Sequence, residues 1–398
     1  MSEKDVREII DNSEEVEESA EETAKYLASL PILDYEKQRK PIAKRLSIRV
    51  GALDELVIKA RSSIERSNTS PNSSTKPSKA NGSNDGSKTE DPVDLEAVRT
   101  LRKGAAATIE HPDPMALVRA AIREAGYAGD TGPAELAYVA LSSRFQDRPL
   151  NLHYEAQSGS GKNFTVDTVL PLFPPDAYHK LDAGSPHALV YSSESFEQRF
   201  IILSECDSIP ADGSAASAIR SITTDCEMSY ETVEKNRTTN KLETRRIVRK
   251  GPTGLITTGI RPLEEQMATR VLRVPLRDDE QQTRQILQAE ARAANQRAEC
   301  TPSAKTEQLI AFQKWLALAG EKRVVVPFAD ALADLVPATI VRMWRDFPKL
   351  LAVIRTLAFL TQYNRQRTSD GEIVATLADY EDARKLLAPS SIQSLPRE

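Results

Sequence analysis

The sequence predicts an α/β fold with helical segments before and after it. Short apolar runs that predict strands alternate with helical or turn-like segments, and they lie at 150–154, 187–191, 199–204, 226–233, 243–249, 254–258 and 270–276. This alternation is typical of a sheet covered by helices. From about residue 279 onward the apolar positions have helical spacing, as they do within residues 12–62. A chain of 398 residues is long enough for two or three folded units.

Changes in composition divide the chain into four parts. Between residues 63 and 94, Ser, Asn, Gly, Lys and Pro replace almost all apolar residues, and such a segment cannot bury enough surface to fold. We therefore expect a small helical N-terminal module at 1–62, a flexible linker at 63–94, an α/β core at 95–278 and an all-α C-terminal lid at 279–398. The lid is predicted to hold helices at 306–319, 328–335 and 348–362 and a short hairpin at 365–376.

The bulk composition excludes several classes of protein. A formal net charge of -5 is too small to define a partner. Cys206, Cys226 and Cys300 are widely spaced, which fits neither a disulfide framework nor a zinc site, so we expect a reducing compartment. The sequence begins with charged residues rather than an apolar signal segment, and its most apolar late run is too short for a membrane span. We therefore expect a cytoplasmic protein with no membrane partner.

A strand, a glycine-rich loop and a helix are predicted in succession near residue 160. The apolar run Leu150–Tyr154 precedes the loop AQSGSGKN, and a helix-compatible stretch follows from Phe164 to Leu172. In the template Gly-x-x-x-x-Gly-Lys-Ser/Thr, backbone N–H groups surround phosphate oxygens, the lysine neutralises them and the hydroxyl binds Mg²⁺. Ala156 and Asn163 depart from this template. The predicted ATP-binding residues are Ser158, Gly159, Ser160, Gly161, Lys162 and Asn163. The alternative is a Gly/Ser turn with an ordinary surface lysine.

A second apolar strand ends in acidic residues. Phe200–Leu203 is followed by Ser204, Glu205 and Asp207, and an ATPase needs carboxylates near the γ-phosphate for Mg²⁺ and for the attacking water. We expect Glu205 to act as catalytic base or Mg²⁺ ligand and Asp207 to be the reserve carboxylate. The predicted Mg²⁺ ligands are Asn163, Glu205 and Asp207. The alternative is a buried strand that leads into a loop with solvated acids.

A basic segment lies between the acidic strand and the apolar run at 254–258. Residues 228–250 contain two β-prone arms around a polar turn, which predicts a long hairpin with a local excess of Lys and Arg. Few aromatic residues are present, so base-specific contacts are not expected. The predicted DNA contacts are Lys235, Arg237, Lys241, Arg245 and Arg246. The alternative is a pair of solvated strands with interleaved charges.

Four stretches resemble the ATPase domain of primase-helicase proteins carried by phages, plasmids and genomic islands, which is an AAA+ P-loop ATPase. The stretches are GSGKN, IILSECDSIP, Leu255–Thr258 and Ala268–Arg270, and the similarity extends from about residue 135 to 385. The fold implied is an AAA+ P-loop ATPase core with a basic β-hairpin insertion, an all-α C-terminal lid and a small helical N-terminal module. The hairpin resembles the one that minichromosome-maintenance-type helicases project into a central pore.

The resemblance also implies roles for individual residues. Glu205 would promote hydrolysis, Thr257 or Thr258 would act as sensor, and Arg270 would reach the ATP of a neighbouring subunit. The last role implies a homo-oligomeric ring, although a surface salt bridge is the alternative for Arg270. Arg345 is a weaker candidate for a second sensor. No primase region is evident upstream, so a separate primase or replication partner is expected.

Two functions remain open at this point, and the N-terminal module bears on a third. The first is an ATP-dependent DNA helicase or translocase subunit that acts on single-stranded DNA without sequence preference, in replication of a mobile element or a related DNA transaction. The second is a nucleotide-gated DNA-binding scaffold or regulator with weak or no ATPase activity. In the third, residues 1–62 read duplex DNA. The module is either a protein-interaction bundle or a helix-turn-helix-like DNA contact through Lys37, Arg39, Lys40, Lys44 and Arg45.

Overall fold

The computed structural model describes two parts of the chain. Before residue 95 it describes residues 23, 27, 28, 32–45, 50, 53, 54 and 57. From residue 95 it describes 95–181, 192, 194–204, 217, 219–221, 223, 227–235, 242–261, 263, 265–276, 279–294, 303–336 and 343–391. Residues Glu96–Leu318 and Lys322–Glu398 form one compact unit, and Met1–Leu95 with Ala319–Glu321 form another. The predicted linker at 63–94 lies outside the described residues.

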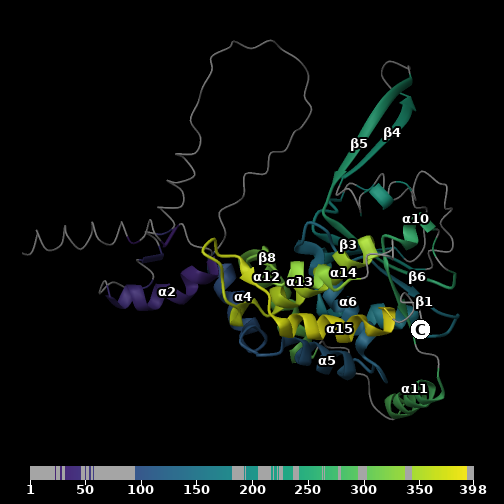
Figure 1. The fold of residues 1–398 in the computed structure, drawn as a ribbon, viewed down its shortest axis with the longest axis horizontal. Coiled ribbons are helices and arrows are strands. Elements are labelled where there is room, and N and C mark those ends of the chain that lie inside the picture. The colour runs from purple at the N-terminus through teal and green to yellow at the C-terminus, as the bar shows by residue number, and fades with distance from the viewer. Residues whose placement is uncertain are drawn as a thin grey trace, which may run out of the picture. The chain divides into compact units, whose positions relative to one another are not determined.

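Alternating helices and strands make up the larger unit (Figure 1). Its strands are β1 (Leu152–Glu155), β2 (Tyr178–Leu181), β3 (Arg199–Leu203), β4 (Glu227–Lys235), β5 (Leu242–Lys250), β6 (Thr253–Gly259), β7 (Leu272–Pro275), β8 (Val324–Val325) and β9 (Ile373–Val374). Its longer helices are α4 (Leu95–Ile109), α5 (Pro114–Glu124), α6 (Gly132–Ser142), α7 (Lys162–Val169), α11 (Glu280–Ala293), α12 (Ala304–Ala319), α14 (Met343–Leu360) and α15 (Leu377–Ser391). The short α10 (Glu265–Ala268) and α13 (Ala329–Asp334) complete the α-helices that are described.

Five parallel strands form the central sheet in the order β2-β3-β6-β1-β7. This parallel sheet with its flanking helices confirms the predicted α/β fold. Strand β6 lies between β1 and β3, with Leu152 opposite Ile256 and Ile202 opposite the same residue on the other side. Because parallel strands share a direction, the carboxyl ends of β1, β6 and β3 meet at one edge of the sheet. The residues that follow these three strands are therefore close in space.

The sheet confirms most of the predicted strands and adds one that was not predicted. The apolar runs near 150, 200, 254 and 272 correspond to β1, β3, β6 and β7. Strand β2 was missed because Tyr178–Leu181 is polar and half-buried at the sheet edge, and so it lacks the apolar signal of a central strand. The strand expected at 187–191 lies outside the described residues.

Gly254 allows β3 and β6 to pack closely. It lies opposite Phe200 in the sheet register. A Cβ atom at Gly254 would lie 2.2 Å from the Cζ atom of the Phe200 ring. Any side chain at this position would therefore collide with the ring, and the glycine is required by packing rather than by backbone conformation.

The helices after residue 279 pack with the sheet and with α6. Helix α6 is buried all around, as expected of a helix with apolar residues on every side. Buried Gln313 of α12 donates to Tyr138 Oη and Ser142 Oγ at 2.9 Å each, and accepts from Arg144 at 2.8 Å. Helix α15 packs on β7 and α14 packs on α6. The division between core and lid at residue 279 stays a prediction, and the short strands β8 and β9 lie within the region that was expected to be all-α.

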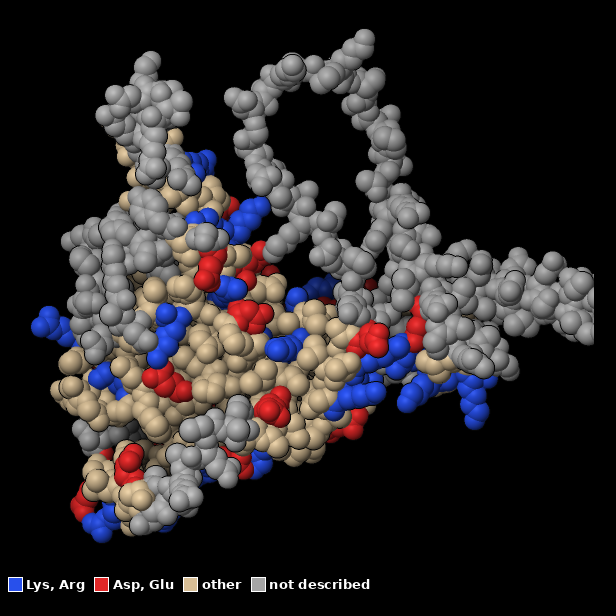
Figure 2. All heavy atoms as spheres, turned by 180° about the vertical axis from the view of Figure 1, so that it is seen from behind, with Lys and Arg blue, Asp and Glu red and all other residues tan. Residues whose placement is uncertain are grey.

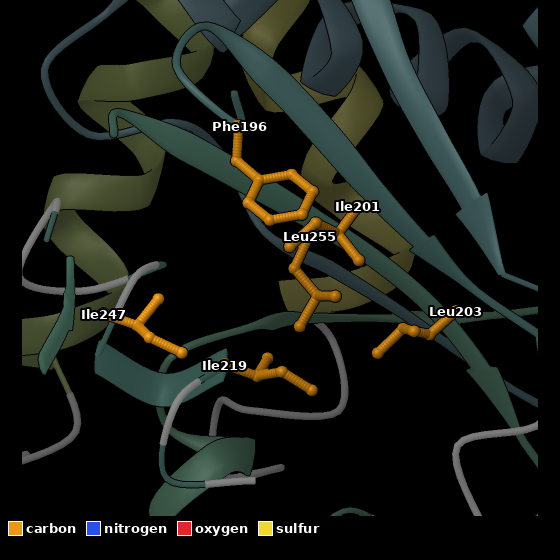
Figure 3. Close-up of a cluster of buried hydrophobic side chains, with 6 residues drawn as sticks. All are labelled: Phe196, Ile201, Leu203, Ile219, Ile247 and Leu255. Atoms are coloured by element: carbon orange, nitrogen blue, oxygen red, sulfur yellow. The ribbon is translucent and has the colours of Figure 1, made fainter. Parts of the chain in front are cut away.

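The inserted strands β4 and β5 pair antiparallel over nine positions, from Glu227 opposite Lys250 to Lys235 opposite Leu242. They extend away from the five-stranded sheet (Figure 1). Among the side chains of this hairpin that the structure describes, Ile247 alone is buried, and it belongs to the apolar cluster drawn in Figure 3. Partly buried Tyr230 packs against the same cluster. The other buried members are Phe196, Ile201, Leu203, Ile219 and Leu255. Farther out, Val233 and Leu242 are 62% and 73% exposed.

The smaller unit contains α2 (Ile32–Arg45) and a small apolar cluster. Its buried members are Leu27, Ala43, Leu53 and Val57. Arg39 and Asp54 form an ion pair of 3.3 Å, and the Arg39 side chain is only 13% exposed. Arg39, one of the DNA contacts considered for this module, therefore has a structural partner.

No helix in the described parts of the chain combines the length and the apolar composition needed to cross a lipid bilayer.

Candidate functional site

The glycine-rich loop connects β1 to the first turn of α7. Gly159 and Gly161 have φ values of 82° and 83°, in the left-handed region that favours glycine. Gly161 is the N-cap residue of α7, so the helix begins at Lys162. The first amide groups of a helix have no intrahelical partner and carry a partial positive charge. The loop therefore directs an N-terminal helix end toward the position where an anion would bind.

Lys162 lies over the loop. Its Nζ donates to the carbonyl oxygens of Ala156 and Gln157, at 2.6 Å and 2.7 Å. These two bonds hold the ammonium beside the amide groups at the start of α7. A phosphate bound there would meet both a full positive charge and several N–H donors.

Thr258 at the end of β6 reaches the start of α7. Its hydroxyl donates to Asn163 Oδ1 at 2.9 Å, across 95 positions of sequence. Thr257 is oriented differently: it is 1% exposed, and its Oγ1 makes no hydrogen bond among the described residues. Of the two sensor candidates, Thr258 is the one that contacts the phosphate loop.

An aromatic pair fastens a second loop to α7. The rings of Tyr127 and Phe164 stack with centroids 5.9 Å apart and planes inclined by 2°. The Thr165 hydroxyl donates to Gly161 O, so Tyr127 Oη is the donor in its 3.1 Å bond to Thr165 Oγ1. Burial raises the pKa of Tyr127 and keeps this phenol protonated. From α11, Gln282 donates to Ala128 O and accepts from Asp130 N, each at 3.2 Å.

A cavity of 650 Å³ lies over the glycine-rich loop. Its wall combines amide groups and a lysine with the half-exposed ring of Phe164. Such a wall offers donors for phosphate and an apolar surface for a flat ring. The lining residues are Ser158, Gly159, Ser160, Gly161, Lys162, Asn163, Phe164, Thr258, Gly259 and Ile260.

The remaining catalytic candidates lie apart from the loop or outside the described residues. Glu205 and Asp207 belong to the second group. Arg270 precedes β7, at the edge of the sheet that carries the amino ends of the strands. It therefore lies at the opposite edge from the phosphate loop of its own chain. Arg345 is exposed in the first turn of α14.

The described residues do not fit the Mg²⁺ site that the P-loop template implies. Asn163 replaces the Ser or Thr whose hydroxyl would bind the metal. Its side-chain oxygen already accepts a hydrogen bond from the Thr258 hydroxyl, and its amide nitrogen carries N–H donors, which repel cations. Among the described residues no group of three or more His, Cys, Asp or Glu side chains could hold a metal ion. The loop therefore offers better ligands to phosphate than to Mg²⁺.

The hairpin brings part of the predicted DNA-binding set to the surface. Arg246 is exposed and donates to Ser229 Oγ at 2.8 Å, and Arg249 bonds to Ser192 O. Figure 2 shows Lys and Arg side chains along the described part of this hairpin. Arg237 and Lys241 lie outside the described residues, and for Lys235 and Arg245 only the strand positions are described.

Residues 102–315, more than half of the chain, match the family described as the MTBMA_p00010 P-loop domain. The chain belongs to this family. The match includes the glycine-rich loop, the whole five-stranded sheet and the hairpin. Membership of this P-loop domain family supports nucleotide binding at the loop. No curated protein matches the chain.

Two residues of the P-loop domain site were not predicted. Tyr127 and Phe164 belonged to no motif that the sequence analysis used, and a single aromatic residue is more often part of a core. Phe164 could have been found from its place in the loop sequence, directly after Lys162 and Asn163. For Tyr127 the sequence has no such signal, since 37 positions separate it from Phe164.

Proposed function

We propose that this protein is an ATP-binding and ATP-hydrolysing subunit that moves along DNA or separates its strands. The proposal extends the nucleotide binding supported by the P-loop domain family to a named nucleotide, a reaction and a substrate. It assigns ATP and Mg²⁺ as cofactors, single-stranded DNA as partner, and a homo-oligomeric ring as the working form.

The arrangement of Lys162 at the start of α7 carries the proposal. The ammonium, the loop amides and the N-terminal end of the helix converge on one cavity, and together they would neutralise the phosphates of a nucleotide. Phe164 supplies an apolar wall to the same cavity and favours a nucleotide over inorganic phosphate alone.

The connection between the sheet and the hairpin supports a coupled function. Thr258, next to the last residue of β6, contacts Asn163, while Leu255 of the same strand packs in the cluster that holds Ile247 of the hairpin. A shift of Asn163 on phosphate binding or release would therefore be transmitted through a single strand, β6, to the base of the hairpin. Exposed Arg246 and Lys250 would attract a phosphate backbone.

Within this proposal, Glu205 acts as catalytic base or metal ligand, with Asp207 in reserve. Arg270 acts on the nucleotide of a neighbouring copy, which fits its distance from the loop of its own chain. Lys162 and the N-terminal end of α7 would hold the phosphates, and a Mg²⁺ ion held by Glu205 or Asp207 would supply further positive charge there.

A second function is favoured by one observation. Asn163 Oδ1 accepts from Thr258, so a P-loop hydroxyl ligand for Mg²⁺ is missing at this position. This departure from the template fits a scaffold or regulator that binds ATP and DNA but hydrolyses ATP slowly.

ATP turnover with and without single-stranded DNA tests the proposal. The intact protein is expected to hydrolyse ATP faster when DNA is present, and Lys162→Ala and Glu205→Gln are expected to abolish that turnover. ATP and DNA binding without turnover would favour the scaffold. Turnover that survives both substitutions would exclude this site as its source.

A further inference from the structure

The Asn163 side chain has a fixed orientation at the mouth of the phosphate loop. Its Oδ1 accepts a hydrogen bond from the Thr258 hydroxyl, with 2.9 Å between the two oxygen atoms, and Thr258 is only 3% exposed. Oδ1 and Nδ2 of a primary amide are bonded to the same carbon and lie in one plane, so a hydrogen bond that fixes the oxygen also fixes the direction of the nitrogen. Asn163 itself is exposed and lines the phosphate cavity, and its Nδ2 makes no hydrogen bond within the described parts of the chain.

The chemistry at this position differs from that of a hydroxyl. A Ser or Thr hydroxyl can offer an oxygen lone pair to Mg²⁺, whereas an amide nitrogen offers only N–H donors. N–H donors bind phosphate oxygens and do not bind cations. The position that coordinates metal in the P-loop template therefore presents hydrogen-bond donors here.

We propose that Asn163, oriented by Thr258, donates directly to a phosphate oxygen and that this chain binds nucleoside triphosphate with little dependence on Mg²⁺. Asn163 is a phosphate-binding residue in this proposal, and Thr258 is its positioning residue. The inference rests on the proposed function, because it assumes that the loop binds nucleotide.

Calorimetric titration of ATP into the intact chain, once with Mg²⁺ and once with EDTA, tests the proposal. For the wild type the two dissociation constants should agree within about threefold. Loss of one charge-assisted hydrogen bond weakens binding by about tenfold. Asn163→Ser should therefore bind about tenfold more weakly in EDTA and recover with Mg²⁺, because it restores the hydroxyl ligand.

Asn163→Asp sharpens the test because it has nearly the same shape. The carboxylate still accepts from Thr258 but has no N–H donor and repels phosphate. Its affinity should fall by more than about tenfold in EDTA and be restored in part by Mg²⁺. Thermal unfolding without ligand should match the wild type for Asn163→Asp, which keeps the acceptor for Thr258, whereas Asn163→Ser removes that acceptor and should unfold at a slightly lower temperature.

Thr258→Val tests the positioning role with a matched control. Removing the hydroxyl leaves the Asn163 amide free to rotate, so ATP should bind more weakly in EDTA. The dissociation constant in EDTA divided by that in Mg²⁺ should therefore rise. Thr168→Val makes the same change in α7, where the hydroxyl bonds only to Phe164 O in its own helix. The ratio should not change in this control.

The outcomes separate this inference from the function on which it rests. The inference is wrong if the wild type binds ATP only with Mg²⁺ and the ratio of its dissociation constants in EDTA and Mg²⁺ is the same for Asn163→Ser. Nucleotide binding at the loop would still be supported by that result. If the wild type binds ATP in neither condition, the proposed function fails and the inference fails with it.

Discussion

The phosphate loop and the β4–β5 hairpin hold their polar side chains in different ways. At the loop, Lys162, Asn163 and Thr258 each have a partner at 2.6–2.9 Å. On the hairpin, Arg246 bonds to the neighbouring Ser229, and the outer positions Val233 and Leu242 are exposed. The loop is held in a fixed geometry, which suits a small ligand with few orientations. Among its described side chains, the hairpin is anchored at its base, which suits contact with a long and variable partner.

The largest difference between the two regions is expected at Lys162. Lys162→Ala removes the one full positive charge that the glycine-rich loop itself presents to the phosphates and should weaken ATP binding by about 100-fold. Stability should not change, because Nζ bonds only to two loop carbonyls. Titration calorimetry and thermal unfolding measure the two effects. Lys314→Ala, an exposed lysine of α12, is the control and should leave ATP affinity unaltered.

The two ends of the hairpin are expected to differ in their contribution to stability. Ile247→Ala removes a side chain from the buried cluster in Figure 3 and should lower the free energy of unfolding by about 2 to 3 kcal/mol. Leu242→Ala, at an exposed position of the same strand, should change it by less than about 0.5 kcal/mol. Denaturant unfolding distinguishes the two. Equal effects would mean that the outer part of the hairpin is also packed.

Thr257 and Thr258 extend the comparison to single hydroxyl groups. Thr257→Val removes a buried hydroxyl that has no hydrogen-bond partner among the described residues and should raise the free energy of unfolding by about 1 kcal/mol. A decrease in denaturant unfolding experiments would show that Thr257 makes a contact in solution. Thr258→Val removes a hydroxyl that donates to Asn163 and should lower the free energy of unfolding.

The smallest effect is expected on the hairpin surface. If the hairpin contacts single-stranded DNA, Arg246→Ala should reduce the slope of log K against log salt by about 0.7, the value for one phosphate contact. Arg284→Ala, an exposed arginine of α11, should leave the slope unchanged. Fluorescence anisotropy at several salt concentrations gives both slopes. Equal slopes for wild type and Arg246→Ala would remove this residue from the DNA contacts.

The sequence predicts the parts of the molecule that depend on local pattern. Strand β1, the glycine-rich loop and α7 follow from one apolar run and one motif, and the hairpin follows from two β-prone arms around a polar turn. Strand β2 could not be predicted, because its half-buried residues at the sheet edge have no apolar periodicity.

Contacts between distant segments are the other part that the sequence does not reveal. Asn163 and Thr258 were each predicted as site residues, but for separate roles, and only the placement of β6 beside β1 brings them together. Nothing in the sequence pattern singles out Gln313, although its side chain forms hydrogen bonds with Tyr138 and Ser142 of α6 and with the nearby Arg144. Its network connects α12 to α6 through contacts that no local pattern predicts.

A structure of the intact protein with a non-hydrolysable ATP analogue tests the central claim most directly. Nucleotide binding at the loop predicts that Lys162 Nζ leaves the carbonyls of Ala156 and Gln157 and donates to a phosphate oxygen, with further bonds from the first amides of α7. An analogue bound elsewhere, for example in the 850 Å³ cavity between residues 123–130 and α11, would contradict the account.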